Sequence, residues 1–124
     1  MYDDNNIFAK ILRDEIPNKT VLEDSSVLAF DDINPQAPVH SLVIPKNKYV
    51  SLNDFAEKAT DTEIANLVRA TVKVAYEKGV KDNGYRLIVN IGPNSHQEVP
   101  HLHFHILGGR KLGPMLAKKH RELE

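Results

Sequence analysis

Apolar residues recur along the chain at two spacings, and each spacing predicts a different kind of element. Helical spacing over Asp61–Lys78 predicts a long helix. Thr60 and Glu63 supply a capping box at its start, and Gly79 suits the position after its last turn. An apolar side over Ile7–Asp14 predicts a short helix near the N-terminus. We therefore expect one long and one short helix.

Runs of apolar and β-branched residues predict strands in most of the remaining chain. We expect four strands and a fifth in a histidine-containing run: Thr20–Glu23, Val27–Asp31, His40–Ile44, Tyr85–Asn90 and His101–Leu107. The connections among the first three strands are too short for parallel crossovers, which favours antiparallel pairing. The expected fold class is α+β, with about five strands in a mainly antiparallel sheet.

The domain organisation follows from the same pattern. No repeat, low-complexity tract or linker interrupts the chain, so we expect residues 1–124 to form a single domain. Residues 110–124 form a short basic tail that is too polar to enter a core. One long helix leaves half of a five-stranded sheet without cover, which favours association into a homodimer.

Composition narrows the function classes. The 16 basic and 17 acidic residues nearly balance, which argues against nucleic-acid binding through bulk charge. The absence of cysteine excludes disulfides, thiol catalysis and cysteine-ligated zinc, and it suits a reducing cytoplasm. No apolar run approaches the roughly 18 residues that a membrane-spanning helix needs. We expect a cytoplasmic protein that has neither nucleic acid nor a membrane as a partner.

Candidate chemistry is concentrated in a run where histidine alternates with apolar residues. His101, His103 and His105 are three of the six histidines in the chain. Because side chains alternate faces along a strand, these three are expected to line one face. The residues between and after them are expected to enter the core on the other face: Leu102, Phe104 and Ile106.

Three interpretations of this face are open. The histidines could be satisfied polar residues on a half-exposed sheet, or zinc ligands together with His40 or Glu98. They could also carry phosphoryl chemistry, with His103 as nucleophile and its neighbours as donors to phosphate oxygens. Residues two apart on a strand are separated by roughly 6.7 Å, so three imidazoles of one strand hardly reach one ion. The spacing therefore favours phosphoryl chemistry.

The motif His-φ-His-φ-His-φ-φ at residues 101–107 resembles the signature of the histidine triad (HIT) superfamily. Further blocks resemble the bacterial type of its Hint branch: Ile7–Pro17, Phe30–His40, Leu42–Lys46, Gln97–Val99 and Leu107–Arg110. The resemblance covers essentially the whole chain. Gly108 and Gly109 after the motif, in place of Pro-Arg, distinguish it from the dinucleoside polyphosphate hydrolase branch.

This resemblance implies a HIT-like fold and a purine nucleoside phosphoramidase. Such an enzyme cleaves the P–N bond of a substrate such as adenosine 5′-phosphoramidate through a nucleotidyl-histidine, releasing nucleoside monophosphate and amine. The resemblance implies no required cofactor, a purine nucleotide such as AMP or GMP as ligand, and a homodimer with one continuous sheet and the tail near the active site. Alternatives are a non-catalytic nucleotide-binding or adaptor module, and a zinc hydrolase built on His101, His103 and His40.

The resemblance also implies roles for individual residues. His103 would be the nucleophile, and His105 would contact phosphate oxygens and help to protonate the leaving amine. His40 and His101 would complete the histidine cluster. Asp32 would accept hydrogen bonds from the ribose hydroxyls, although a carboxylate that caps the proline-containing loop is the alternative.

The remaining positions would form the walls of the nucleotide site. The apolar slot for the base would consist of Ile7, Phe8, Ile11, Phe30 and Ile33, of which Ile11 and Phe30 could equally be core residues. Other nucleotide contacts are expected from Asn90, His96, Gln97, Glu98 and Val99. Ser95 and His96 occupy a turn where the family often has glycine. Glu98 stands where animal relatives have a serine and bacterial relatives often have Glu.

Overall fold

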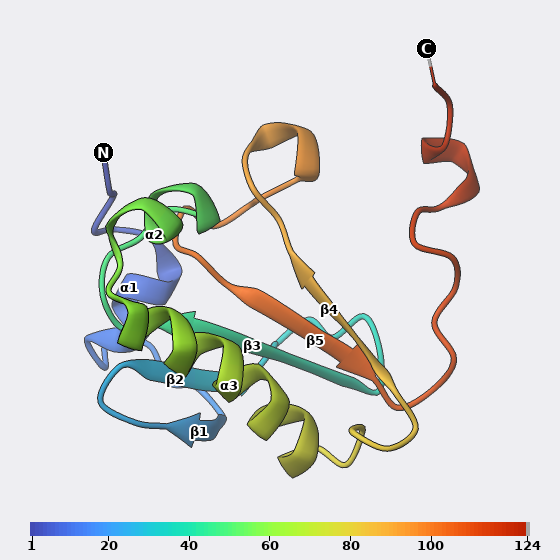
Figure 1. Cartoon of the computed structure of the whole chain (residues 1–124), viewed down its shortest axis with the longest axis horizontal. Coiled ribbons are helices and arrows are strands. Elements are labelled where there is room, and N and C mark those ends of the chain that lie inside the picture. Colours follow the sequence, from blue (N-terminus) through green and yellow to red (C-terminus); the bar gives the residue numbers. More distant parts are fainter. Residues whose placement is uncertain (124) are drawn as a thin grey trace.

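The computed structural model of the chain describes residues 1–123 and is organised around one five-stranded sheet (Figure 1). Its strands are β1 (Thr20–Glu23), β2 (Val27–Asp31), β3 (Val39–Pro45), β4 (Tyr85–Val89) and β5 (Phe104–Gly108). The spatial order is β1-β2-β3-β5-β4, and every neighbouring pair is antiparallel. These strands confirm the predicted α+β class and the antiparallel sheet.

The helices are α1 (Ile7–Leu12), α2 (Leu52–Lys58) and α3 (Asp61–Glu77). In α3 the side chain of Thr60 accepts from the Glu63 backbone N–H, which confirms the predicted capping box. Gly79 follows the helix with a φ of +74°, the left-handed conformation that glycine adopts readily. The helix predicted over Ile7–Asp14 ends two residues early, because Asp14 has a φ of 61°.

The prediction of one long and one short helix is wrong, because α2 is a second short helix. Its start carries a capping box in which the side chain of Asp54 accepts from the Ser51 N–H at 2.8 Å. Only Phe55 of α2 is buried, so the helix lacks the apolar repeat on which the prediction depends.

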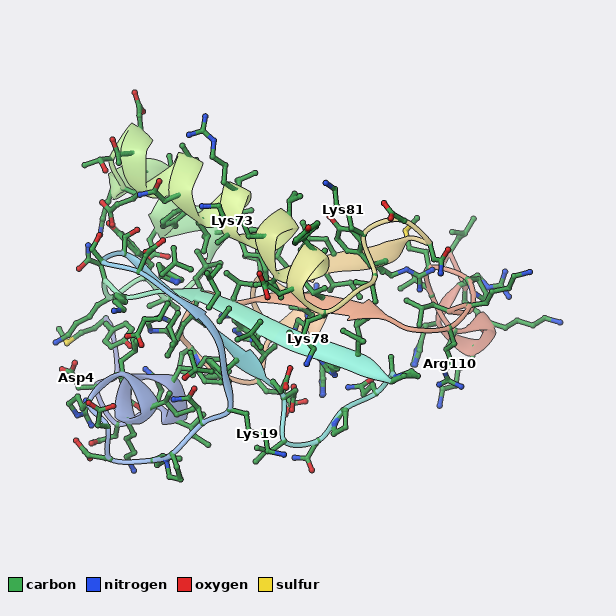
Figure 2. The ribbon with its side chains drawn as sticks, turned by 90° about the horizontal axis from the view of Figure 1, so that it is seen from below. Asp4, Lys19, Lys73, Lys78, Lys81 and Arg110 are labelled. Atoms are coloured by element: carbon green, nitrogen blue, oxygen red, sulfur yellow. The ribbon has the colours of Figure 1, made fainter. Side chains whose placement is uncertain are left out.

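Apolar side chains pack on both faces of the sheet. Helix α3 lies over one face, and the short α1 lies over part of the other (Figure 2). Along β2, Val27 and Ala29 enter the cluster under α3, while Leu28 and Phe30 enter the cluster under α1. The alternation of side chains along a strand thus supplies two separate cores. The cluster on the α1 side is small, which leaves room on that face for a cavity.

The expectation of a fifth strand over His101–Leu107 needs correction, because β5 begins only at Phe104. The last β3 residue that pairs with β5 is Val43, opposite Phe104. Farther along β3, Pro45 has no N–H with which to continue the ladder. The alternation nevertheless persists through the irregular segment. Leu102 is 1% exposed and packs in the α3 cluster with Phe104.

Two further features complete the fold. After Gly109 the chain leaves the sheet at the end of β5, and its tail projects away from the strands (Figure 1). Arg86 of β4 donates to the carbonyl of Gly113 at 2.8 Å. Within residues 1–123, no helix combines the length and apolar character that crossing a bilayer requires.

Candidate active site

A cavity of about 400 Å³ opens beside α1, and His103 and His105 form part of its wall. The other lining residues come from α1 and the turn after it, from β2 and the following loop, from β3, and from residues 90–99. They are Ile7, Phe8, Ile11, Ile16, Pro17, Asn18, Phe30, Asp31, Asp32, Ile33, Asn34, Gln36, Leu42, Asn90, His96, Glu98 and Val99. The structure therefore brings together most of the predicted site residues in one hollow.

All residues of the predicted base slot line this cavity. Phe8 and Phe30 stand edge to face with ring centroids 5.6 Å apart. Ile11 and Phe30 are 6% and 4% exposed, so each is both a core residue and a cavity wall. Ile33 is 82% exposed at the opening, where a bound planar group would cover it.

A backbone carbonyl determines which ring nitrogen of His103 carries the proton. Its Nδ1 lies 2.7 Å from the carbonyl oxygen of His101, which can only accept a hydrogen bond. Nδ1 therefore carries the proton, and Nε2 keeps a free lone pair. The ring also stands edge to face with Phe8, at a centroid distance of 4.9 Å. His103 thus presents an oriented, unprotonated nitrogen beside the apolar slot.

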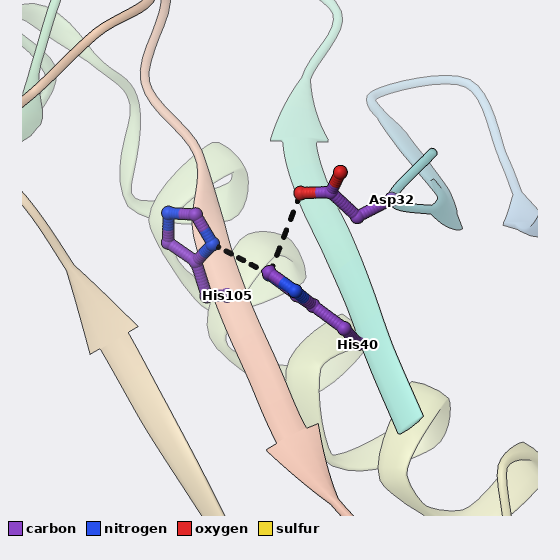
Figure 3. A group of neighbouring side chains, drawn as sticks. All are labelled: Asp32, His40 and His105. Atoms are coloured by element: carbon purple, nitrogen blue, oxygen red, sulfur yellow. Dashed lines mark hydrogen bonds and ion pairs between the residues drawn. The ribbon is translucent and has the colours of Figure 1, made fainter. Parts of the chain in front are cut away.

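A second hydrogen-bond chain fixes the proton on His105. The backbone N–H of Gln36 donates to His40 Nδ1 at 3.1 Å, so the proton of a neutral His40 is on Nε2. That N–H points to His105 Nδ1 at 3.0 Å, with the Asp32 carboxylate 3.4 Å away (Figure 3). Because His105 Nδ1 accepts, its Nε2 carries the proton and is a donor.

His101 lies behind His103, fully buried, and does not belong to the cavity wall. Its Nε2 donates to the carbonyl of Pro45 at 2.9 Å, and its Nδ1 accepts from the hydroxyl of Tyr2 at 2.5 Å. Sequence reasoning missed Tyr2, because no local pattern connects it to a residue 99 positions away.

Burial favours the neutral form of all four histidines of the cluster. It lowers the pKa of His101 to about 4, and it is also the main cause that lowers the pKa of His105 to about 4. Burial lowers the pKa of His103 and of His40 as well, although Asp32 partly opposes this shift at His40. A neutral His103 is the form that can act as a nucleophile.

Asp32 caps the turn of the proline-containing loop and also lines the cavity. One carboxylate oxygen accepts from the Asn34 backbone N–H at 2.8 Å and caps the turn. The other oxygen faces His40, and the residue lines the cavity. The turn therefore orients a carboxylate that a ligand hydroxyl can reach.

Residues 90–99 differ in whether their side chains reach the cavity. Asn90, His96, Glu98 and Val99 line the cavity, whereas the Gln97 side chain turns into the loop. Gln97 donates to the carbonyls of Val50 and Val99 and accepts from the Gly92 N–H. These hydrogen bonds connect the loop to the carbonyl of Val50, so the Gln97 side chain stabilises the loop. The prediction that it touches nucleotide stays a prediction.

His96 Nε2 lies 2.9 Å from a carboxylate oxygen of Glu98, and both exposed side chains line the cavity. His96 has a φ of 64°, a left-handed conformation that non-glycine residues seldom adopt. This conformation gives a physical reason for the glycine expected at this turn. In this chain the turn instead carries an imidazole that is paired with a carboxylate.

The arrangement of ligand atoms argues against the zinc alternative. Both ring nitrogens of His101 are hydrogen-bonded, one to Tyr2 and the other to Pro45. The set His101, His103 and His40 therefore does not converge on an ion. Asp32, His40 and His105 do place one ligand atom each within 4.8 Å of one another. However, the Gln36 N–H occupies His40 Nδ1 and forces the proton onto Nε2, the atom that would have to bind the metal.

Comparison with known proteins identifies the family of the chain. The HIT domain family matches residues 13–112. A HIT-like protein of Azospirillum brasilense is 57% identical over 94% of this chain and 96% of its own length. The purine nucleoside phosphoramidase of Escherichia coli K12 is 44% identical over 94% of this chain and 97% of its own length.

A solved structure gives the same result. A HIT family hydrolase from Clostridium thermocellum superimposes with a TM-score of 0.85 and 39% identity, covering 93% of this chain and 99% of that one. The fold thus matches that of a HIT family hydrolase. The chain belongs to the HIT family.

Proposed function

We propose that this protein hydrolyses the P–N bond of purine nucleoside phosphoramidates, such as adenosine 5′-phosphoramidate. The observation that carries the proposal is the orientation of His103, whose Nδ1–H is held by the His101 carbonyl while Nε2 is free. The similarity to a purine nucleoside phosphoramidase supports this choice of substrate class.

The cavity offers a separate contact for each part of such a substrate. The planar base would lie between the α1 side chains and Phe30, and Asp32 would accept from the ribose hydroxyls. The Nε2–H of His105 would donate to a phosphate oxygen. Asn90 lines the same cavity and would contact the phosphate or the ribose.

The reaction would proceed by two displacements at phosphorus. His103 Nε2 attacks phosphorus and the P–N bond breaks, while the leaving nitrogen takes a proton from a water molecule beside His105. The resulting hydroxide attacks the phosphorus of the nucleotidyl-histidine, and the Nε2–H of His105 donates to a phosphate oxygen in both steps. The P–Nε2 bond breaks, and nucleoside monophosphate leaves. The two proposed displacements require no cofactor.

We also propose the homodimer with a joined sheet. On α3, Val68, Val72 and Tyr76 follow one another at four-residue spacing and are 54%, 44% and 69% exposed. Leu87, which is 44% exposed, lies on the edge strand β4. A second copy would cover this apolar surface and pair with the edge. That the tail of residues 110–124 lies near the active site stays a prediction.

The experiment compares AMP release from adenosine 5′-phosphoramidate by wild type, His103→Ala and Lys73→Ala. We expect His103→Ala to lose at least about a thousandfold in kcat. Lys73→Ala, on the other face of the sheet, should retain wild-type rates. Equal AMP release by wild type and His103→Ala would sink the proposal.

The second candidate, a nucleotide-binding or adaptor module, is favoured only by the apolar slot and Asp32, neither of which requires chemistry. AMP binding by wild type without turnover of any phosphoramidate would support it. The zinc hydrolase would be revived by stoichiometric zinc in the purified protein together with loss of activity on chelation.

A further inference from the structure

The segment that carries the nucleophile is not held by the sheet. The β5 ladder begins at Phe104, so His103 and the two residues before it lie outside strand pairing. The backbone of this segment is tied to the rest of the protein by the Leu102 N–H, which donates to the Tyr49 carbonyl at 2.8 Å. The side chain of His101 supplies a further tie.

The His101 ring connects two distant parts of the chain. It is 0% exposed, and its Nε2–H is donated to the carbonyl of Pro45 at the end of β3. This proton position leaves Nδ1 as a buried acceptor, which is costly unless a donor reaches it. The hydroxyl of Tyr2 is that donor, at 2.5 Å.

Tyr2 is itself fixed in place by its neighbours. Its ring stands edge to face with the His101 ring at a centroid distance of 5.6 Å. The Lys48 ammonium lies 5.9 Å from the centroid of the Tyr2 ring and forms an ion pair with Asp4 at 2.7 Å. The hydroxyl is thus directed at His101 by contacts on two sides.

We propose that Tyr2 is a positioning residue for the nucleophile His103. Its hydroxyl fixes the tautomer and the orientation of His101, and the carbonyl of His101 in turn holds the Nδ1–H of His103. Without the hydroxyl, Nδ1 of His101 has no hydrogen-bond donor. The ring then carries its proton on Nδ1 instead of Nε2, and the hydrogen bond from Nε2 to the Pro45 carbonyl is lost. The carbonyl that orients His103 then loses its anchor. This inference rests on the proposed function only where it concerns rate.

The test compares Tyr2→Phe with the matched variant Tyr85→Phe. Tyr85 pairs with Gly108, at the opposite end of β5 from the nucleophile. For Tyr2→Phe we expect kcat for adenosine 5′-phosphoramidate to fall about tenfold while KM stays within about twofold. Tyr85→Phe should match wild type in both constants.

Two-bond ¹H–¹⁵N spectra of the imidazoles provide a readout that does not depend on turnover. In wild type, His101 should be protonated on Nε2 and His103 on Nδ1, and Tyr2→Phe should alter both patterns. A kcat within twofold of the Tyr85→Phe value overturns the proposal, even if the melting temperature falls. A reduced kcat with unchanged spectra of His101 and His103 overturns it as well.

The same spectra separate this inference from the proposed function. If wild type releases no more AMP than His103→Ala, the phosphoramidase proposal fails and the spectra alone decide about Tyr2. Altered His101 and His103 patterns in Tyr2→Phe would then support the positioning role, and unaltered patterns would overturn it.

Discussion

At the residue scale, backbone groups, together with the Tyr2 hydroxyl at His101, place the protons of the histidine cluster. The Gln36 N–H donates to His40 Nδ1. The His101 carbonyl accepts from His103 Nδ1, and the Pro45 carbonyl accepts from His101 Nε2. Backbone groups cannot rotate away as a side chain can. The tautomers are therefore fixed when the chain folds, and a substrate meets a nucleophile and a donor that are already oriented.

The pH dependence of activity should report the burial of His103. We expect the acid limb of the kcat/KM profile for a phosphoramidate to be centred below pH 6.5. Burial lowers the pKa of His103 from 6.5, and protonation removes the Nε2 lone pair. Initial rates of AMP release, corrected for uncatalysed acid hydrolysis, give the profile. An acid limb centred above pH 6.5 would contradict this account.

Sequence patterns predicted the local part of the site and missed its long-range part. Period-two alternation placed His103 and His105 on one side because it persists into the irregular segment before β5. The Tyr2 hydroxyl and the Gln36 N–H act through contacts that no spacing encodes. Gln97 lies within a matched motif, yet its side chain braces the loop, because motif position does not fix side-chain direction.

At the element scale, capping boxes define where both helices of the α2–α3 region begin. Each box satisfies backbone N–H groups that have no partner inside the helix. The α3 box was predictable because an apolar repeat follows it. The α2 box also has its pattern in the sequence, but α2 buries a single apolar side chain, so periodicity gave no support for a helix there.

Removal of the α3 cap should destabilise the whole fold. We expect Thr60→Ala to lower the free energy of unfolding by about 1 kcal/mol, because the Glu63 N–H loses its acceptor. Thr62→Ala, at an exposed position in the first turn, is the matched control and should change little. Urea denaturation followed by circular dichroism measures both. Equal losses in the two variants would show that the cap contributes nothing specific.

At the scale of the whole molecule, the apolar surface of α3 leads to a prediction about assembly. We expect Val72→Glu to convert a dimer into a monomer, because it places a charge in the surface that a second copy would bury. Lys73→Glu, on the next residue, should remain dimeric. Sedimentation velocity distinguishes these states. A monomeric wild type would remove the basis of the proposed dimer.

The buried histidines also make the stability of the fold depend on pH. The pKa of His101 is about 4 in the fold and about 6.5 in the unfolded chain, so below pH 6.5 the unfolded chain binds the proton first. The contribution is complete above pH 6.5. It is lost as the pH falls toward 4, by on the order of 3 kcal/mol.

Urea midpoints measured across this pH range should therefore fall with pH in wild type. His101→Gln removes the titrating ring while keeping an amide that can donate and accept, and its midpoints should fall less steeply. Identical slopes for the two proteins would locate the acid sensitivity elsewhere in the molecule.

The late start of β5 has a consequence for the response of the protein to heat. The residues from Phe104 onward share the cooperative stability of the sheet, whereas His101 and His103 depend on a few separate hydrogen bonds. Warming should release these bonds before the ladder melts. The upper temperature limit of catalysis would then be set by residues 101–103 and by their hydrogen bonds to Tyr2, Pro45 and Tyr49. The core would still be intact at that temperature.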